Sequence, residues 1–293
     1  MVDQVRRFNR TVTQRVGALD DGFLGRRRPL GEARLLWEIG PDSCEVRALR
    51  SRLELDSGYV SRLLRSLESD GLVTVAPSEG DRRTRTARLT RAGRAERTLL
   101  DTRSDDLAKS FLEPLTASQR ERLVDAMRDV ERLLTAALVE IRPVDPLHPD
   151  ARRCVTSYFA ELNLRSDSGF DPAAGISAEP HELRPPAGLM LVAYLRAEAV
   201  GCGAVKHHPA APSEIKRMWV ADHARGLGIG RRMLAELEAQ AIASGARAAR
   251  LETNRALTEA IALYRSAGYV EVPAFNDEPF AHHWFEKAFT RSA

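Results

Sequence analysis

The stretch LESDGLVTVAPSEGDRRTRTARLTRAG, residues 67–93, decides the fold of the first half of the chain. Within it, residues 72–76 and 84–89 alternate polar and apolar side chains on either side of a polar turn, which predicts two antiparallel strands. Gly71 is placed to end the preceding helix with a left-handed cap, and Thr90 to cap the next one. A helix, a basic hairpin and a second helix in this order predict a winged helix-turn-helix.

The residues before this stretch have the spacing of helices. Apolar positions repeat with a helical period over residues 5–19, 29–37 and 46–53. A fourth helix is predicted to begin at an N-cap formed by residues 56–57, and its buried face holds Val60, Leu63, Leu64 and Leu67. Its opposite face carries side chains of the kinds that contact phosphates and base edges, namely Ser57, Ser61, Arg62 and Arg65.

The charged residues are unevenly distributed. The 293 residues include 44 basic and 41 acidic side chains, and a net charge of +3 does not by itself suggest nucleic acid. However, residues 82–97 hold seven arginines and one acidic residue. On the predicted wing, Arg82, Arg83 and Arg85 are candidates for contacts to the DNA backbone or minor groove. The alternative is a solvated basic face, because 40 of the 44 basic residues are arginines, as in proteins from GC-rich genomes.

Three patterns in this half resemble the MarR family of bacterial transcriptional regulators. They are L-x-x-x-G-L at residues 67–72, D-x-R at 81–83 and L-T-x-x-G at 89–93. The resemblance covers residues 1 to about 141. It implies a mainly α winged-helix domain and a homodimer, in which the first and last helices pair and two recognition helices face a palindromic operator in double-stranded DNA.

The last helix of this half is predicted from its own sequence. Thr116 and Gln119 form a capping box at its start. Its apolar face consists of Leu123, Met127, Val130, Leu134, Ala137 and Leu138. Such a stripe is core in most proteins, whereas the MarR resemblance makes it a dimer interface.

A proline-rich segment separates the two halves. Pro143, Pro146 and Pro149 stiffen residues 141–149, because each proline removes a backbone donor and biases its predecessor away from helix. We therefore predict a winged-helix domain over residues 1–141, a linker over 142–149 and a second domain over 150–293.

The second half contains a glycine-rich loop before a helix. Strands are predicted at residues 188–195, 199–205 and 214–220, and the loop Arg225-Gly-Leu-Gly-Ile-Gly-Arg231 follows them. Its glycines let backbone N–H groups point inward and form, with the helix N-terminus, a nest for a phosphate. Arg225 and Arg231 could add charge-assisted bonds to a pyrophosphate. The GxGxxG pattern of dinucleotide-binding folds is absent.

Two patterns in this half resemble the GNAT superfamily of N-acetyltransferases. They are R-x-x-G-x-G at residues 225–230 and A-x-x-L-Y-x-x-x-G-Y at 260–269, and the resemblance covers about 150–290. It implies an α/β fold with a mixed, mostly antiparallel sheet, and direct acetyl transfer from acetyl-CoA to an amine. Tyr264 would protonate the departing thiolate, and an N–H of residues 218–220 would polarise the thioester. The implied cofactor-binding residues are Met218, Trp219, Val220, Arg225, Gly226, Leu227, Gly228, Ile229, Gly230, Arg231, Asn254 and Tyr264.

The acceptor side of the reaction needs a base and a pocket. Glu214 begins the strand that lines the thioester, so it is the first candidate for the base, although a solvated role is common for such a residue. The alternatives are His207, His208, His282 and His283. Residues that could contact the acceptor are Phe159, Phe170, Asp277, Glu278 and His282. Phe159 could instead pack in the core. Residues 275–285 could instead be a turn between two strands without contact to the acceptor.

Several classes of protein are disfavoured by the sequence. No apolar stretch is long enough to span a membrane, and the N-terminus lacks the apolar core of a secretion signal. Cys44, Cys154 and Cys202 are too widely spaced to suggest a disulfide framework or a metal site. We expect a cytoplasmic protein, associated with the nucleoid when bound to DNA, that regulates transcription and acetylates a small amine. The alternatives are a regulator that only senses acetyl-CoA or a metabolite, and a protein-lysine acetyltransferase.

Overall fold

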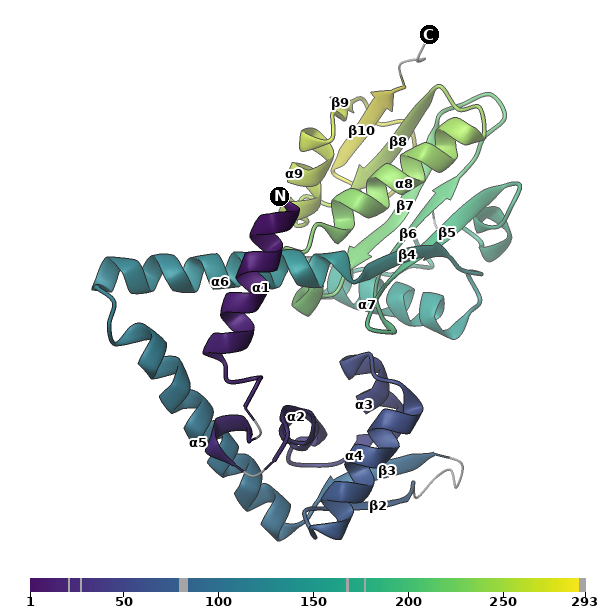
Figure 1. Cartoon of the computed structure of the whole chain (residues 1–293). Coiled ribbons are helices and arrows are strands. Elements are labelled where there is room, and N and C mark those ends of the chain that lie inside the picture. The colour runs from purple at the N-terminus through teal and green to yellow at the C-terminus, as the bar shows by residue number, and fades with distance from the viewer. Residues whose placement is uncertain (21, 27, 79–83, 167–168, 177, 290–293) are drawn as a thin grey trace. The chain divides into compact units, whose positions relative to one another are not determined.

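The computed structural model describes residues 1–20, 22–26, 28–78, 84–166, 169–176 and 178–289. The chain divides into two compact units, Met1–Met127 and Arg128–Ala293, and each is considered by itself (Figure 1). The predicted boundary at residue 141 lies inside a strand of the second unit. The division therefore falls earlier, within a long helix.

The first unit contains the predicted order of elements. Its helices are α1 (Val2–Arg15), α2 (Leu30–Ile39), α3 (Val46–Leu53), α4 (Ser57–Ser69) and α5 (Arg91–Leu112), and α6 (Ala117–Ala137) continues into the second unit. A short 3-10 turn occupies Phe23–Gly25. The strands β1 (Cys44–Glu45), β2 (Val73–Pro77) and β3 (Arg85–Leu89) form an antiparallel sheet in the order β1-β3-β2.

Side-chain caps fix the ends of these helices as the sequence predicts. Asp56 accepts a hydrogen bond from the N–H of Tyr59, and Thr90 accepts one from the N–H of Gly93. The capping box at α6 is also confirmed, because Thr116 and Gln119 each donate a backbone N–H to the other's side chain. Such caps satisfy N–H groups that the first turn of a helix leaves unpaired.

Gly93 is required by a close approach between α5 and the base of the wing. A Cβ atom at this position would lie 1.9 Å from the carbonyl oxygen of Leu72. The core beside it contains the apolar faces of α2 and α4, with Leu35, Leu36, Leu64 and Leu67 all buried. The predicted buried face of α4 is thus confirmed.

The apolar stripes of α1 and α6 stay exposed within the chain. No residue of these two helices, both of which lie in the described ranges, is buried. Val5 and Phe8 on α1 are 57% and 43% exposed, and Met127 and Leu134 on α6 are 50% and 64% exposed. These stripes therefore do not form the core of the first unit.

The second unit is built on a seven-stranded sheet. Its strands are β4 (Val139–Pro143), β5 (Gly188–Leu195), β6 (Glu198–Lys206), β7 (Ser213–Val220), β8 (Ala248–Thr253), β9 (Val270–Val272) and β10 (His283–Ala288). Their order in the sheet is β4-β5-β6-β7-β8-β10-β9. The β7–β8 pair is parallel and the other described pairs are antiparallel, which confirms the predicted mixed sheet.

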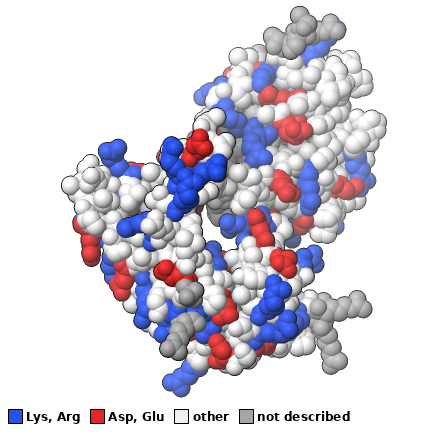
Figure 2. Space-filling model, in the orientation of Figure 1, with Lys and Arg blue, Asp and Glu red and all other residues white. Residues whose placement is uncertain are grey.

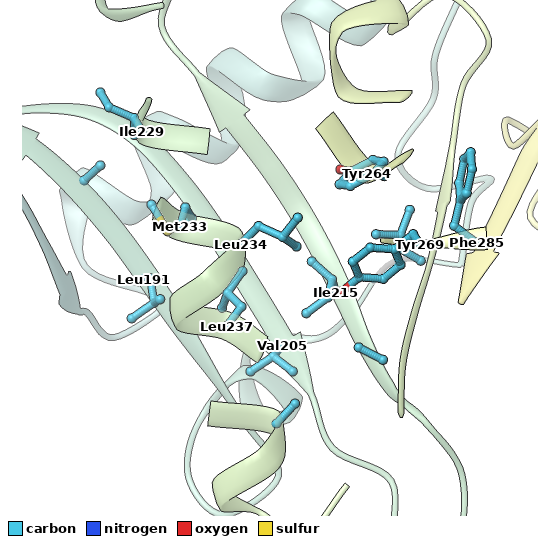
Figure 3. Packing of buried hydrophobic residues seen from close by; sticks show 14 of the residues in the cluster. Leu191, Val205, Ile215, Ile229, Met233, Leu234, Leu237, Tyr264, Tyr269 and Phe285 are labelled. Atoms are coloured by element: carbon cyan, nitrogen blue, oxygen red, sulfur yellow. The ribbon is translucent and has the colours of Figure 1, made fainter. Parts of the chain in front are cut away.

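Helices cover both faces of this sheet. They are α7 (Pro149–Arg165), α8 (Ile229–Ala243) and α9 (Thr258–Ser266), with short 3-10 turns at Pro180–Leu183 and Asp222–Ala224. Successive residues of a strand point to opposite faces. On β5, Leu191 therefore packs in the cluster that includes α8, whereas Met190 and Val192 pack in the cluster that includes α7. Figure 3 shows Met233, Leu234 and Leu237 of α8 over the first of these faces.

The predicted linker is not a separate segment. Residues 139–143 form β4, which pairs with β5, and α7 begins at Pro149. Pro143 is compatible with this position because β4 is an edge strand, where a missing N–H donor is tolerated.

Strand β7 is irregular where it faces the helices. Cys202 pairs with Trp219 and Ala204 with Lys216, so two residues of β7 oppose the single residue Gly203 of β6. Arg217 lies in this bulge with φ at +57°. On its other side, β7 pairs with β8 only at Ser213 and Glu214. The two strands separate beyond these residues, and two cavities of the second unit are lined in part by this stretch of β7.

Candidate functional sites

A large groove lies beside the end of β7 and the start of α8. Its volume is about 650 Å³, and α7, β7, the glycine loop and α9 all contribute to its lining. Of the residues expected to hold a cofactor, ten line it: Tyr264 together with Met218, Trp219, Val220, Arg225, Gly226, Gly228, Ile229, Gly230 and Arg231. Tyr264 lines it from α9.

The glycine loop has a backbone conformation that suits the predicted nest. Gly226 and Gly228 have φ angles of +79° and +75°, and α8 begins directly afterwards at Ile229. The first turn of a helix presents N–H groups without intrahelical partners and carries partial positive charge. These features fit the pyrophosphate of acetyl-CoA, and the groove is large enough for an extended ligand. Leu227 differs from the prediction, because its side chain packs against the core.

The two arginines of the loop have different surroundings. The Nη2 atom of Arg225 lies 2.7 Å from both carboxylate oxygens of Glu161, and its Nη1 atom lies 2.6 Å from Asp222. Arg231 is exposed and donates to the hydroxyl of Ser266. Arg225 is therefore neutralised within the chain, and Arg231 is the loop arginine whose charge is available to a phosphate.

Tyr264 is held rigidly in the core. Its ring lies 6.0 Å from that of Tyr269 and 6.1 Å from that of Phe285, and Figure 3 shows these three side chains together. Burial, with a contribution from the charge of Glu252, raises the pKa of Tyr264 well above its usual value. The hydroxyl is thus protonated at any working pH, as a proton donor to a thiolate must be.

Asn254 lies elsewhere than expected. Its amide donates to the carbonyl oxygen of Phe280, and its Oδ1 atom accepts from the N–H of Ala256. The side chain is buried and lines a second cavity next to the groove. The amide nitrogen and the amide oxygen of Asn254 therefore both bond to the backbone of neighbouring loops. That Asn254 binds the cofactor stays a prediction.

The second cavity is smaller and more aromatic. Its volume is about 90 Å³, and it lies between α7, residues 170–176, Ala178, residues 278–281 and the strands β7 and β8. Phe159, Phe170 and Glu278 line it, as expected for the acceptor site. Asp277 and His282 are exposed and are not among the described lining residues. Tyr158 and Leu162 line both cavities, so the two adjoin at this face of α7.

For Glu214, the predicted base, the structure differs from the expectation. Its carboxylate lies 2.6 Å from Arg250 and 3.6 Å from Lys216, and it lines neither cavity among the described residues. Burial raises its pKa, but Arg250, Lys216 and His208 outweigh this effect and hold the pKa below its ordinary value. Glu214 therefore lies away from both cavities in the described part of the chain, and its role as the base stays a prediction.

The four candidate histidines are also engaged elsewhere. His207 lies 3.2 Å from the hydroxyl of Ser213, and His208 lies 3.4 Å from Glu214. His283 lies 2.6 Å from Glu271. Together with the exposed His282, they are absent from the described lining of both cavities.

Several lining residues were not predicted from the sequence. The sequence around Glu161 did not indicate that it lines the groove, because its partners Arg225 and Trp219 lie about 60 positions later in the chain. Glu252 and Lys216 lie on neighbouring strands, and only the strand order brings them together. The alternation of β8 could have indicated Glu252, since Leu251 faces the core and Glu252 must face the other side. The other unpredicted residues are Tyr158, Arg217 and Phe280.

The first unit has a groove at its predicted DNA-binding face. Ser57 and Ser61 of α4 line it together with Arg85 of the wing, and all three are among the residues predicted to contact DNA. Arg47 and Arg50 of α3 line it as well and were not predicted. Figure 2 shows Lys and Arg side chains gathered over α4 beside the wing. Arg82 and Arg83 lie outside the described residues.

Arg62 and Arg65 are exposed on α4 and lie close to its own residues. The guanidinium of Arg62 is 5.6 Å from the ring of Tyr59, and Arg65 donates to the carbonyl oxygen of Ser61. Neither forms an ion pair with a carboxylate in the part of the chain that the structure describes. Both charges therefore remain available to phosphates.

Comparison with protein families gives two matches. Residues 28–84 match the MarR family, and residues 186–271 match the acetyltransferase (GNAT) domain. The chain thus carries a MarR-type winged-helix segment followed by a GNAT acetyltransferase domain. This finding confirms the predicted resemblance, the predicted enzyme class and acetyl-CoA as the cofactor that this class uses.

Individual relatives cover parts of the chain. An IAA acetyltransferase from Azospirillum brasilense is 43% identical over 82 residues, which are 28% of this chain, and the chain spans only about half (54%) of that relative. A GNAT-family acetyltransferase from Staphylococcus aureus is 14% identical, with a TM-score of 0.44, over 51% of this chain and 98% of its own. Bordetella bronchiseptica BpsR is 17% identical, with a TM-score of 0.38, over 44% and 98%. Among the described residues, no helix is long and apolar enough to cross a membrane.

Proposed function

We propose that the chain is a bifunctional bacterial transcriptional regulator and N-acetyltransferase. It binds operator DNA through its first unit, and its second unit transfers acetyl directly from acetyl-CoA to a primary amine. The acceptor is a small molecule, such as an amino acid or another amino-bearing metabolite. The protein acts in the cytoplasm, and on the nucleoid when bound to DNA.

One observation carries the enzymatic part of this proposal. The large groove with the phosphate nest adjoins the small aromatic cavity at Tyr158 and Leu162, and Tyr264 lines the groove from α9. Two cavities that meet beside a protonated hydroxyl suit a reaction between two bound substrates. A domain that only senses acetyl-CoA would not need the second cavity.

Different residues of the groove bind the cofactor, polarise the thioester and supply a proton. The nest at Gly226 and Gly228 binds the pyrophosphate, with Arg231 adding charge. The backbone of β7 near Met218 lies along the groove, where an N–H can polarise the thioester carbonyl. Bound acetyl-CoA supplies an activated acetyl group, and Tyr264 donates the proton that the departing sulfur needs.

The regulatory part rests on the face of α4 and the wing. Ser57, Ser61 and Arg85 line one groove there, and Arg62 and Arg65 keep their charges unpaired. The exposed apolar stripes of α1 and α6 supply a surface for a homodimer. A two-fold dimer would present two copies of α4 to a palindromic site.

A thiol-release assay over a panel of primary amines tests the enzymatic part. We expect Tyr264→Phe to lower kcat by about 100-fold, the typical size of a lost proton-transfer group, while the Kd for acetyl-CoA stays unchanged. Tyr269→Phe is the matched control, because Tyr269 is equally buried and touches Tyr264 but is not among the described lining residues. Turnover that never exceeds hydrolysis with any amine would refute the enzymatic part.

A further inference from the structure

Aromatic rings form one wall of the small cavity. Tyr158 and Phe159 of α7 lie 5.5 Å apart, Phe159 and Phe170 lie 5.4 Å apart, and Phe170 and Phe280 lie 4.8 Å apart. All four line the cavity and remain partly exposed. Tilted rings at such spacing offer both faces and edges to another ring. This wall therefore favours a ligand with a planar apolar group.

Hydrogen bonds hold the segment that covers this cavity. The N–H of Phe170 donates to Asn163, and the N–H of Ile176 donates to the carboxylate of Glu278 at 2.6 Å. Arg217 donates to the carbonyl oxygen of Ala178 at 2.5 Å. These contacts fasten both ends of the cover to the domain. Together with a volume of only about 90 Å³, they favour a small free molecule over a residue within a protein chain.

One carboxylate that belongs to the lining of this cavity has a buried oxygen without a partner in the described part of the chain. The side chain of Glu252 is 9% exposed, and its Oε1 atom forms an ion pair with Lys216. Its Oε2 atom has no hydrogen-bond partner among the described residues. An unpaired buried acceptor costs free energy, and more so when it is charged. The position of Glu252 in the cavity lining indicates that a ligand supplies the missing donor.

The charges around Glu252 alternate in sign. Arg250 pairs with Glu214, Glu214 lies 3.6 Å from Lys216, and Lys216 pairs with Glu252. A cation bound at the unpaired oxygen of Glu252 would be the next positive charge in this row of alternating charges. The charge of Glu252 also contributes, after burial, to the raised pKa of Tyr264, so the two groups lie in one electrostatic neighbourhood.

We propose that the acceptor is a small primary amine with a planar apolar group, which stacks on the rings of Phe170 and Phe280. Its ammonium group binds the free oxygen of Glu252, and Glu252 is the base that removes the first proton. Lys216 is a positioning residue that holds the carboxylate. This proposal depends on the acetyltransferase function proposed above and names its acceptor class and its base.

The proton balance of the reaction is complete with these groups. Glu252 takes one proton from the ammonium, and the neutral nitrogen attacks the thioester carbon. The C–N bond forms, the C–S bond breaks, and Tyr264 gives its proton to the departing sulfur. The second proton lost by the nitrogen restores the Tyr264 hydroxyl, and Glu252 releases its proton to solvent. The products are an amide, CoA as its thiol and one proton.

Replacing the carboxylate by an amide tests Glu252. We expect Glu252→Gln to lower kcat by about 100-fold with ethylamine, because the amide cannot take a proton. With 2,2,2-trifluoroethylamine, which is of similar size but largely unprotonated at pH 7, the loss should fall below about tenfold. This difference between two amines separates a base from a residue that only supports the fold.

Glu238→Gln is the matched control for this experiment. Glu238 is also a mostly buried carboxylate, paired with Lys287 at 2.7 Å and with one unpartnered oxygen in the described structure, but it lines neither cavity. We expect the activity of this variant to match the wild type with both amines. A similar loss in Glu238→Gln and Glu252→Gln would overturn the role of Glu252.

The aromatic wall is tested with benzylamine against n-butylamine. We expect the wild type to prefer benzylamine in kcat/KM by about tenfold, and Phe280→Ala to remove most of this preference through KM, since stacking is a binding term. Equal values for the two amines in the wild type would overturn the acceptor class. So would efficient acetylation of lysine side chains in peptides with no turnover of free amines.

The outcomes separate this inference from the function on which it rests. If the wild-type protein releases thiol with amines but Glu252→Gln is equally active, only the inference fails. If the wild type binds acetyl-CoA but turns over no amine at all, the proposed acetyltransferase function is refuted, and the inference about its acceptor is refuted with it. Calorimetric binding of acetyl-CoA to each variant shows that the fold of the groove is intact.

Discussion

The two surfaces that we propose for phosphates are built differently. In the second unit, the nest is made of backbone at Gly226 and Gly228, and its neighbouring Arg225 is neutralised by Glu161. In the first unit, the face of α4 presents Arg62 and Arg65 with no ion pair among the described residues. The nest presents backbone N–H groups in fixed directions, whereas the face of α4 presents the charges of exposed arginine side chains.

This difference suits the two ligands. A cofactor must be held in one position relative to the acceptor, so rigid N–H groups are effective. DNA is first bound through its phosphates, and that part of the affinity depends on the release of counterions. The number of arginines is therefore a poor guide to anion binding in this chain, and the partners of each arginine are a better one.

The largest effect is expected from the backbone of the nest. Gly228→Val would place a branched side chain at a φ of +75°, which costs roughly 2 kcal/mol of strain and should weaken acetyl-CoA binding by about 30-fold. The matched control is Gly245→Val, since Gly245 has a φ of +90° at the end of α8, away from the described lining of the groove. Calorimetry measures both. Equal losses would show that strain in the fold, and not the nest, governs binding.

An intermediate effect is expected for the free arginines of α4. Arg62→Ala should lower the slope of log affinity against log salt by about 1 for duplex DNA, which is roughly tenfold in affinity near 0.1 M salt. Arg34→Ala removes the same charge from an arginine that is already paired with Glu38 at 2.7 Å, so it should change the slope much less. Fluorescence anisotropy at several salt concentrations gives both slopes. Identical slopes would place Arg62 outside the interface.

The smallest effect is expected at Glu161. Its carboxylate lies 2.7 Å from Arg225 and 2.9 Å from Arg165, so Glu161→Gln removes one negative charge from beside the groove and makes its potential more positive. We expect acetyl-CoA to bind about threefold more tightly at low salt, with the gain lost at high salt. Weaker binding would show instead that Glu161 orients Arg225 for the cofactor. Titration at two ionic strengths distinguishes the two.

Local signals in the sequence predicted the elements well. The bounds of α3 and β5 agree with the prediction to the residue, and the caps at Thr90 and Thr116 are present. Each of these signals lies within a few residues of the feature that it predicts. The linker was misread because prolines mark both linkers and edge strands, and the pairing of β4 with β5 is not visible in the sequence.

The groove and the small cavity also differ in how far the sequence could predict them. The nest is formed by one continuous segment, so its pattern was sufficient. The acceptor cavity combines side chains from α7, β7, β8 and two loops, and the environment of Glu214 depends on Arg250 across the sheet. Both Glu214 and Glu252 are buried beside Lys216, and the three-dimensional arrangement of the strands decides that only Glu252 is among the described lining residues of the small cavity.

The bulge at Arg217 lets a single strand line both the groove and the small cavity. In a regular strand, Lys216 and Arg217 would point to opposite faces, and one of them would enter the core under α8. Because of the extra residue, both line the acceptor cavity, while Met218 faces the groove. Deleting Arg217 would therefore shift every later residue of β7 by one step. Each of these side chains would then point to the opposite face of the sheet.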